Sequence, residues 1–416
     1  MGQCFIINAA GMTKESKEAV IKHGIDEAFD TLSGEQLQSL GTMWDLCESK
    51  ATTSSSTVTT TVSDGVADTK RYGDYECVSA SDPHPIFTHP VIDIELIGKT
   101  MPPGLASTGM LKPHGYFFVK RGGESSGGEA DWSGYPRSVP VYAPITSWLR
   151  TVHPYRSGAY GNQAPEPPIE YMLIFEVSCE VYYKLDHLAP LPDVIKEAGP
   201  FPMGESTQLN TPLKIEGGEL VSYWSGVNPG GNVDLGVYNT TIERTYANQS
   251  RYADGWHDAW LNEDCPFDYF PEKLRKKYYE LFYDMNAGTI AGPQDCRTSA
   301  QSDILGTVQG AWFEPGKYGS VFAISTSMSG LVLATFEAHA ETGASFAIKV
   351  PPEDATYIDP SKITSKHCYQ THEAYSGNMP PMYINLDLVS PTALQVEYGT
   401  GICNERTPVE TLSLER

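Results

Sequence analysis

Apolar and polar residues alternate in many short segments between residues 90 and 400, and a period of two is typical of strands with one buried face. Residues 91–96, Val-Ile-Asp-Ile-Glu-Leu, show this alternation clearly, and turns rich in Gly and Pro separate the segments. The pattern predicts a mainly β chain with antiparallel sheets. Further strands are expected around His114 and Asp234 and at residues 139–144, 147–152, 171–177, 180–185, 306–313, 321–325, 331–336, 345–350, 383–388 and 394–398, and residues 213–226 are expected to turn at their paired glycines.

Three segments have the period of an α-helix instead. Residues 13–32 and 33–47 each place apolar residues on one face, which predicts an N-terminal helical hairpin. Residues 271–282 predict one amphipathic helix with Pro271 in its first turn. A Ser/Thr-rich segment favours a linker, with an exposed β segment as the alternative. The expected division is 1–50 for a first strand and the hairpin, 51–71 for the linker, 72–250 for a first β domain, and 251–416 for a C-terminal β domain with one leading helix.

Acidic residues outnumber basic ones by 52 to 29, which gives a formal net charge of -23. A nucleic acid or an anionic membrane is therefore disfavoured as a partner, because its phosphates would be repelled. No run of about 18 apolar residues occurs, so no transmembrane segment is expected. The 38 Gly, 30 Pro and 24 Tyr agree with a β chain rich in turns and aromatic residues.

Eight cysteines are scattered along the chain without a Cys-x-x-Cys pair, which favours disulfides over a zinc knuckle. Cys368 and Cys403 flank the last predicted strands and are the pair that we expect to be bonded. Asn239 and Asn248 each begin a glycosylation sequon and are candidate acceptors. These features predict an extracytoplasmic protein, either secreted, periplasmic or at the cell surface.

Three polar residues lie at the edges of alternating segments: His114, His187 and Asp234. Sheet pairing can bring such distant positions together, so they are candidates for one site carried by strands. The alternative is an ordinary structural role, in which backbone groups satisfy both histidines and Asp234 caps a turn.

Five motifs occur in order across residues 102–239, about a third of the chain: the His114 segment, Val-Tyr-Ala-Pro at 141–144, Tyr-Lys-Leu-Asp-His-Leu at 183–188, a glycine turn leading to Ser-Gly within 217–226, and Asn-Val-Asp at 232–234. Their order resembles the lysostaphin-type zinc endopeptidases, a family that also has enzymatically dead members and that has His-x-His where this chain has Asn-Val-Asp. The resemblance implies an antiparallel β-sandwich, with His114 as the first metal ligand and His187 as a catalytic histidine. Together with the flanking alternation, it predicts that His114, His187 and Asp234 fall on neighbouring strands of one sheet.

Two departures from the family pattern weaken the metal site that the resemblance implies. Phe118 occupies the position of an Asp ligand, and Asp234 replaces the final His ligand. His114 and Asp234 alone would hold zinc poorly, because a hydrolytic centre needs three protein ligands plus water. If His187 joined them, a set of two His and one carboxylate could bind zinc, manganese or iron. We expect no tightly bound ion, so no cofactor is predicted.

The C-terminal third carries Gly-Thr-Val-Gln-Gly-Ala-Trp-Phe at 306–313 and loosely resembles uncharacterised secreted bacterial and archaeal proteins. Its evenly spaced strands predict a small sandwich or barrel. No P-loop, Rossmann fingerprint, His-Glu-x-x-His or Gly-x-Ser-x-Gly motif is found elsewhere.

Three functions fit these patterns. The first is a non-catalytic protein that keeps a degenerate peptidase-like domain for binding a cell-surface polymer or protein, or for assembly. The second is a metal-dependent hydrolase of peptide or peptidoglycan, with His114 and Asp234 as ligands and His187 as a ligand or acid/base. The third is a self-assembling filament or surface-layer subunit, in which the apolar residues 1–10 complete the sheet of a neighbour.

Overall fold

The computed structural model describes residues 77, 84–107, 109–120, 139–156, 169–224, 232–252, 260–284, 289–293, 295–317, 319–336, 347–371 and 382–416. The chain divides into two compact units, Met1–Asp68 and Thr69–Arg416. The predicted hairpin at 13–47, the linker at 51–71 and the proposed edge strand at 1–10 lie outside the described residues.

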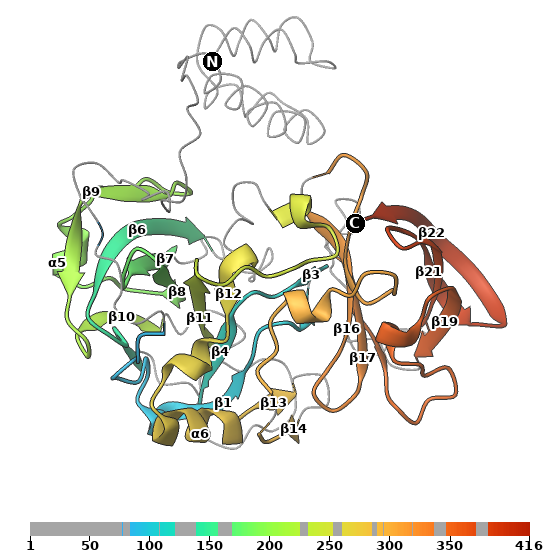
Figure 1. Ribbon diagram of the computed structural model, residues 1–416, viewed down its shortest axis with the longest axis horizontal. Coiled ribbons are helices and arrows are strands. Elements are labelled where there is room, and N and C mark those ends of the chain that lie inside the picture. Colours follow the sequence, from blue (N-terminus) through green and yellow to red (C-terminus); the bar gives the residue numbers. More distant parts are fainter. Residues whose placement is uncertain are drawn as a thin grey trace, which may run out of the picture. The chain divides into compact units, whose positions relative to one another are not determined.

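A ten-stranded antiparallel sheet forms the first part of the second unit, in the order β1-β4-β11-β8-β7-β6-β9 (Figure 1). β10 joins it through β8 and carries β5, and β12 pairs with β11. Alternate residues of these strands point into one core that includes Phe117, Leu149 and Val237. The strands are β1 (Ile97–Met101), β4 (Gly115–Val119), β5 (Val139–Tyr142), β6 (Ser147–Arg156), β7 (Ile169–Glu176), β8 (Val181–Leu188), β9 (Thr207–Ile215), β10 (Leu220–Trp224), β11 (Asn232–Asn239) and β12 (Glu263–Asp264).

An eight-stranded antiparallel sheet follows, with the order β18-β17-β16-β15-β22-β21-β20-β19. Its two edge strands, β18 and β19, contact each other, so the sheet curls around a second core that includes Trp312, Phe322 and Ile384. The orange and red strands of Figure 1 show this sheet. They are β15 (Gly310–Phe313), β16 (Ser320–Thr326), β17 (Val332–Phe336), β18 (Ala347–Val350), β19 (Lys366–Thr371), β20 (Met382–Ser390), β21 (Ala393–Ile402) and β22 (Glu405–Glu415).

The chain between the two sheets packs mainly on the first one. Helix α6 (Glu272–Glu280) begins after Pro271, as predicted, and buries Tyr278 beside Phe267 and Phe282 in the first core. The first sheet and its packing therefore extend to about Phe282, beyond the expected boundary at 250/251. The remaining short elements in the described ranges are β2 (Ala106–Ser107), β3 (Met110–Leu111), β13 (Tyr283–Asp284), β14 (Thr289–Ile290), α5 (Asp193–Lys196) and the 3-10 turns η2 (Ile94–Leu96), η5 (Gln249–Tyr252), η7 (Pro266–Tyr269), η8 (Ala300–Ser302) and η9 (Pro360–Lys362).

The mainly β, antiparallel prediction is confirmed, but the strand predicted at 91–96 is wrong. There the side chain of Asp93 accepts a hydrogen bond from the Glu95 amide and starts the turn η2, so that β1 begins only at Ile97. β19 and β22 were not predicted. The outer half of β22 is exposed on both faces, and polar residues there do not alternate with apolar ones.

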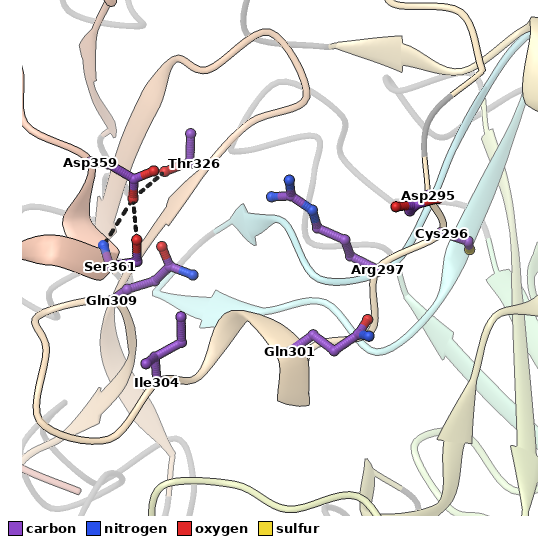
Figure 2. Close-up of a pocket in the computed structure, with 9 residues that line it drawn as sticks. All are labelled: Asp295, Cys296, Arg297, Gln301, Ile304, Gln309, Thr326, Asp359 and Ser361. Carbon is purple, nitrogen blue, oxygen red and sulfur yellow. Dashed lines mark hydrogen bonds between the residues drawn. The ribbon is translucent and has the colours of Figure 1, made fainter.

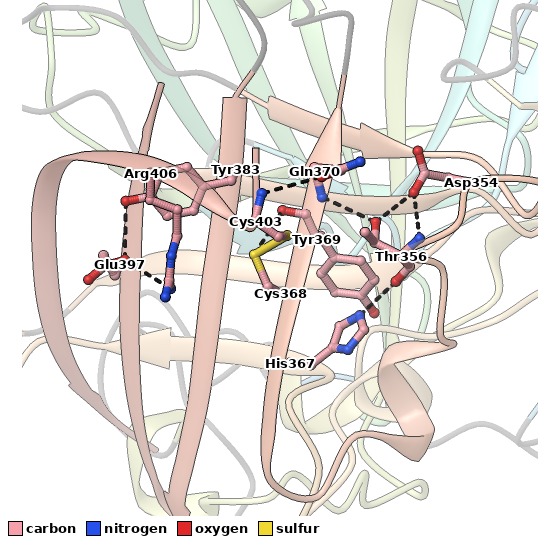
Figure 3. The surroundings of a disulfide bond; sticks show 10 residues. All are labelled: Asp354, Thr356, His367, Cys368, Tyr369, Gln370, Tyr383, Glu397, Cys403 and Arg406. Atoms are coloured by element: carbon pink, nitrogen blue, oxygen red, sulfur yellow. Dashed lines mark hydrogen bonds and ion pairs between the residues drawn. A yellow bond between two sulfur atoms is a disulfide. The ribbon is translucent and has the colours of Figure 1, made fainter. Parts of the chain in front are cut away.

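Three disulfides join described cysteines: Cys77–Cys179, Cys265–Cys296 and Cys368–Cys403. The last is the pair that the sequence favours, and it ties β19 to the turn between β21 and β22 (Figure 3). Beside it, the Cys403 amide donates to the Gln370 side chain. No helix in the described part of the chain is long and apolar enough to cross a membrane.

The sequon at Asn239 is not an open acceptor in the folded chain. Asn239 is fully buried, and its side-chain amide donates to the Tyr269 hydroxyl. Asn248 is partly buried and donates to the backbone oxygen of Arg416. A glycan on either amide nitrogen would displace these hydrogen bonds, and on Asn239 it would also open the core.

Candidate functional site

Neighbouring strands of the first sheet bring the three predicted site residues together. Asp234 on β11 lies opposite Tyr116 of β4 on one side and Asp186 of β8 on the other. His114 directly precedes β4, and His187 lies near the end of β8. The Nε2 atoms of His114 and His187 lie 3.0 and 3.6 Å from the same atom, Oδ2 of Asp234. The predicted convergence on neighbouring strands is confirmed; the metal and catalytic roles of these residues stay predictions.

The Asp234 carboxylate is buried and closely surrounded by donors. Its side chain is 6% exposed, and Oδ1 accepts a hydrogen bond of 2.5 Å from the Asn232 side-chain amide. Burial alone would raise the pKa of Asp234, but His114 and His187 together hold it well below its usual range. The carboxylate is therefore ionised and already has hydrogen-bonding or charged partners on both oxygens.

His187 is the most constrained of the three residues. Its φ of 64° is the only positive value at a non-glycine residue in the described part of the chain. Its backbone amide donates to Asp186, and its ring Nδ1 lies 3.0 Å from Oε2 of Glu170, which is fully buried. The Tyr155 hydroxyl donates to Asp186 and lies 3.1 Å from the same Nδ1. Such strain is retained only where surrounding contacts fix the residue.

These contacts decide the charge of His187. Burial alone would lower the pKa of its ring, but Asp234, the hydrogen bond to Glu170 and the charge of Asp186 raise it to about 9. At neutral pH the ring is therefore an imidazolium, with a proton on each nitrogen.

His114 has the opposite character. Burial first, and then the charge of Lys184, lower the pKa of its ring to about 4, although Asp234 opposes the shift. The neutral ring donates from Nε2 to Asp234. Its buried Nδ1 has no hydrogen-bond partner within the described residues. The two histidines that face Asp234 are thus held in different protonation states at neutral pH.

Two lysines add positive charge around the same carboxylate. Burial lowers the pKa of Lys112 to about 8, while Asp234 raises it and Lys184 lowers it further. Lys184 is 7% exposed, and its Nζ lies 3.9 Å from Oδ2 of Asp186. Three carboxylates, those of Asp234, Asp186 and Glu170, therefore face three cationic groups, those of Lys112, Lys184 and His187.

This arrangement does not fit a divalent metal ion. The position expected to carry an Asp ligand holds Phe118, which packs in an apolar cluster with Met101 and Leu105. His187 would have to lose a proton with a pKa of about 9, and an ion would be repelled by Lys112 and Lys184. No group of three or more His, Cys, Asp or Glu side chains in the described ranges is arranged to hold a metal ion.

Sequence reasoning missed the residues that set these charges. Glu170 and Lys112 lie in segments that resemble ordinary strands and turns, and no local motif marks them. Lys184 and Asp186 lie within the motif at 183–188, but the resemblance gives them no role. Only the pairing of β7 with β8 and of β8 with β11 shows that these side chains surround His187 and Asp234.

No protein-family model, curated protein or solved structure matches the chain.

Proposed function

We propose that this chain is a non-catalytic extracytoplasmic protein, in which a degenerate peptidase-like domain serves to bind a cell-surface polymer or protein or to take part in assembly. The observation that carries the proposal is the state of Asp234. Its carboxylate already contacts His114, His187 and Asn232 within 3.6 Å, so each oxygen has a partner with which a metal or a water nucleophile would compete. We interpret the site as a charge-balanced network that fixes β4, β11 and β8 to one another.

The order of strands supports the finer assignment to a lysostaphin-type sandwich. In the resemblance, the first ligand, the catalytic histidine and the last motif come from strands that lie side by side. Here β4, β11 and β8 also lie side by side. His114 directly precedes β4, Asp234 lies on β11 and His187 lies on β8. The fold assignment remains a proposal because it depends on motif order and pairing alone.

The disulfides support an extracytoplasmic location, because such bonds persist mainly in oxidising compartments. The abundance of tyrosine adds little support for a binding surface. Tyr183, Tyr252 and Tyr278 are among the largest fully buried side chains, so they serve the cores and not a recognition surface.

The hydrolase alternative draws support from His187. A strained histidine whose Nδ1 contacts a buried carboxylate has the geometry of an oriented acid/base. Under this alternative, His187 would exchange a proton with a bound peptide or glycan-peptide. The self-assembly alternative depends on residues 1–10. If deleting these residues leaves the sedimentation of the protein unchanged, this alternative is wrong.

Purified full-length protein should separate the first two possibilities. We expect no release of soluble fragments from peptidoglycan or from a pentaglycine peptide, with or without added zinc or manganese. We also expect less than stoichiometric transition metal by elemental analysis after dialysis. Turnover that disappears in the variant His187→Asn, but persists in the variant His153→Asn, would overturn the proposal, because both variants lose an imidazole and only one alters the Asp234 site.

A further inference from the structure

A pocket of about 370 Å³ lies apart from the Asp234 site and shares no lining residue with it. One wall is the segment 295–301, which the disulfide Cys265–Cys296 anchors, and the other includes Thr326 of β16 and Asp359 and Ser361 at η9 (Figure 2). Pockets for small ligands run from about 300 to 1,000 Å³. The pocket is therefore large enough for a small molecule.

Opposite charges line this pocket without pairing. Arg297 makes no ion pair or hydrogen bond with any described residue, and Figure 2 shows its guanidinium extending toward the side where Asp359 lies. Asp359 is fixed through one oxygen only, since Oδ1 accepts from the Ser361 amide at 2.9 Å and from the Ser361 hydroxyl at 2.7 Å. Within the described residues, no group donates to its Oδ2. A donor and an acceptor of opposite charge thus face the same space.

Two amide side chains add neutral hydrogen-bonding groups to the lining. Gln309 is 6% exposed, and its backbone is held by Thr307 and Arg416, whereas its side-chain amide has no partner in the described part of the chain. Gln301 uses its Oε1 to accept from the Thr298 amide, which leaves its NH2 group to the pocket. The polar side-chain atoms of Gln309 are not buried, so its amide is open to a ligand in the pocket.

The charges of the lining restrict the ligand class. Asp295 and Asp359 outnumber Arg297, so the pocket carries a net charge of one minus two, or -1, and a lone anion such as phosphate would be repelled. A molecule with both an ammonium and a carboxylate group satisfies both kinds of charge. Amides pair well with a peptide bond, because each presents both a donor and an acceptor.

We propose that this pocket binds a small zwitterion of the size of an amino acid or a short peptide. Arg297 binds the carboxylate, Oδ2 of Asp359 binds the ammonium group, and the amides of Gln301 and Gln309 bind the polar groups between them. The proposal does not depend on the function assigned above, since no residue of the Asp234 site takes part.

Isothermal titration of the full-length protein with alanine, alanylalanine and trialanine at pH 7 tests this proposal. We expect at least one of the three to bind, and we expect the variants Arg297→Gln and Asp359→Asn each to weaken it about tenfold or more, because each removes a charge-assisted hydrogen bond. Asn at 359 keeps an oxygen for Ser361, so η9 should be preserved. Arg275→Gln, on α6 and outside the pocket, is the matched control and should bind as the unaltered protein does.

Blocked ligands provide a second measurement that needs no variant. Acetylation of the amino group or amidation of the carboxylate should each weaken binding of the same peptide about tenfold. The proposal is overturned if none of the three zwitterions binds at millimolar concentration. It is equally overturned if both blocked forms bind within twofold of the parent, or if Arg297→Gln and Asp359→Asn bind like the control.

Discussion

The charge of His187 predicts how stability depends on pH, and the variant His187→Asn isolates that dependence. Asn is the suitable replacement because it accepts a positive φ more readily than most residues, and the φ of His187 is 64°. The folded chain raises the pKa of His187 from 6.5 to about 9, against the effect of burial, through Asp234, Glu170 and Asp186. The contribution of His187 to stability is therefore complete below pH 6.5 and is lost as the pH rises through 9.

The magnitude follows from the size of the shift. The difference between about 9 and 6.5 is about 2.5 pKa units, and each unit corresponds to about 1.36 kcal/mol, which gives about 3 kcal/mol. The side chain is 22% exposed, so solvent screening removes only part of this energy. The free energy of unfolding should thus differ between the unaltered protein and His187→Asn by about 3 kcal/mol more at pH 6.5 than at pH 9.5.

Urea denaturation followed by circular dichroism, at several pH values between 6 and 9.5, measures this difference. An NMR titration of the His187 ring should give a midpoint near 9 in the folded protein. The variant His153→Asn serves as control, since it also removes an imidazole from the first sheet, but one that contacts the Ser206 hydroxyl and forms no ion pair with a carboxylate in the described residues. A His187 midpoint below 7, or a stability difference independent of pH, would refute the charge assignment.

Three further perturbations test other parts of the fold. His114 stays neutral in the folded chain but takes up a proton when the chain unfolds, so the unaltered protein should lose about 3 kcal/mol of stability between pH 6.5 and pH 4. The variant His114→Gln should lack this loss, which urea denaturation at both pH values measures. Replacing Cys368 and Cys403 together by Ser should cost about 3–4 kcal/mol from the lost loop constraint, measured by denaturation; a loss below about 1 kcal/mol would contradict it. Arg150→Met should cost about 3–5 kcal/mol by leaving buried Glu176 unpaired, and adding Glu176→Leu should recover most of this loss.

The sequence by itself determined the parts of the fold that depend on neighbours along the chain. Alternation located most strands of both sheets, and Pro271 marked the start of α6. The paired glycines after β9 predicted a turn, where Gly218 has a φ of 85°. These signals work because backbone preference and one-sided burial act within a few residues. They failed at 91–96, where one hydrogen bond from Glu95 to the Asp93 side chain favoured a turn over a strand with the same alternation.

Motif order along the sequence also pointed to His114, His187 and Asp234, and their convergence was predicted from the flanking alternation and from the sandwich that the resemblance implies. Only the tertiary structure decided what that meeting point is. Glu170 lies 17 residues from His187 along the chain, yet its carboxylate contacts the ring at 3.0 Å through the pairing of β7 and β8. Burial in a low-dielectric interior then makes such contacts strong enough to charge one histidine and keep the other neutral. Charge states are set by what surrounds a group in space, and sheet pairing brings those surroundings from segments that are far apart in the sequence.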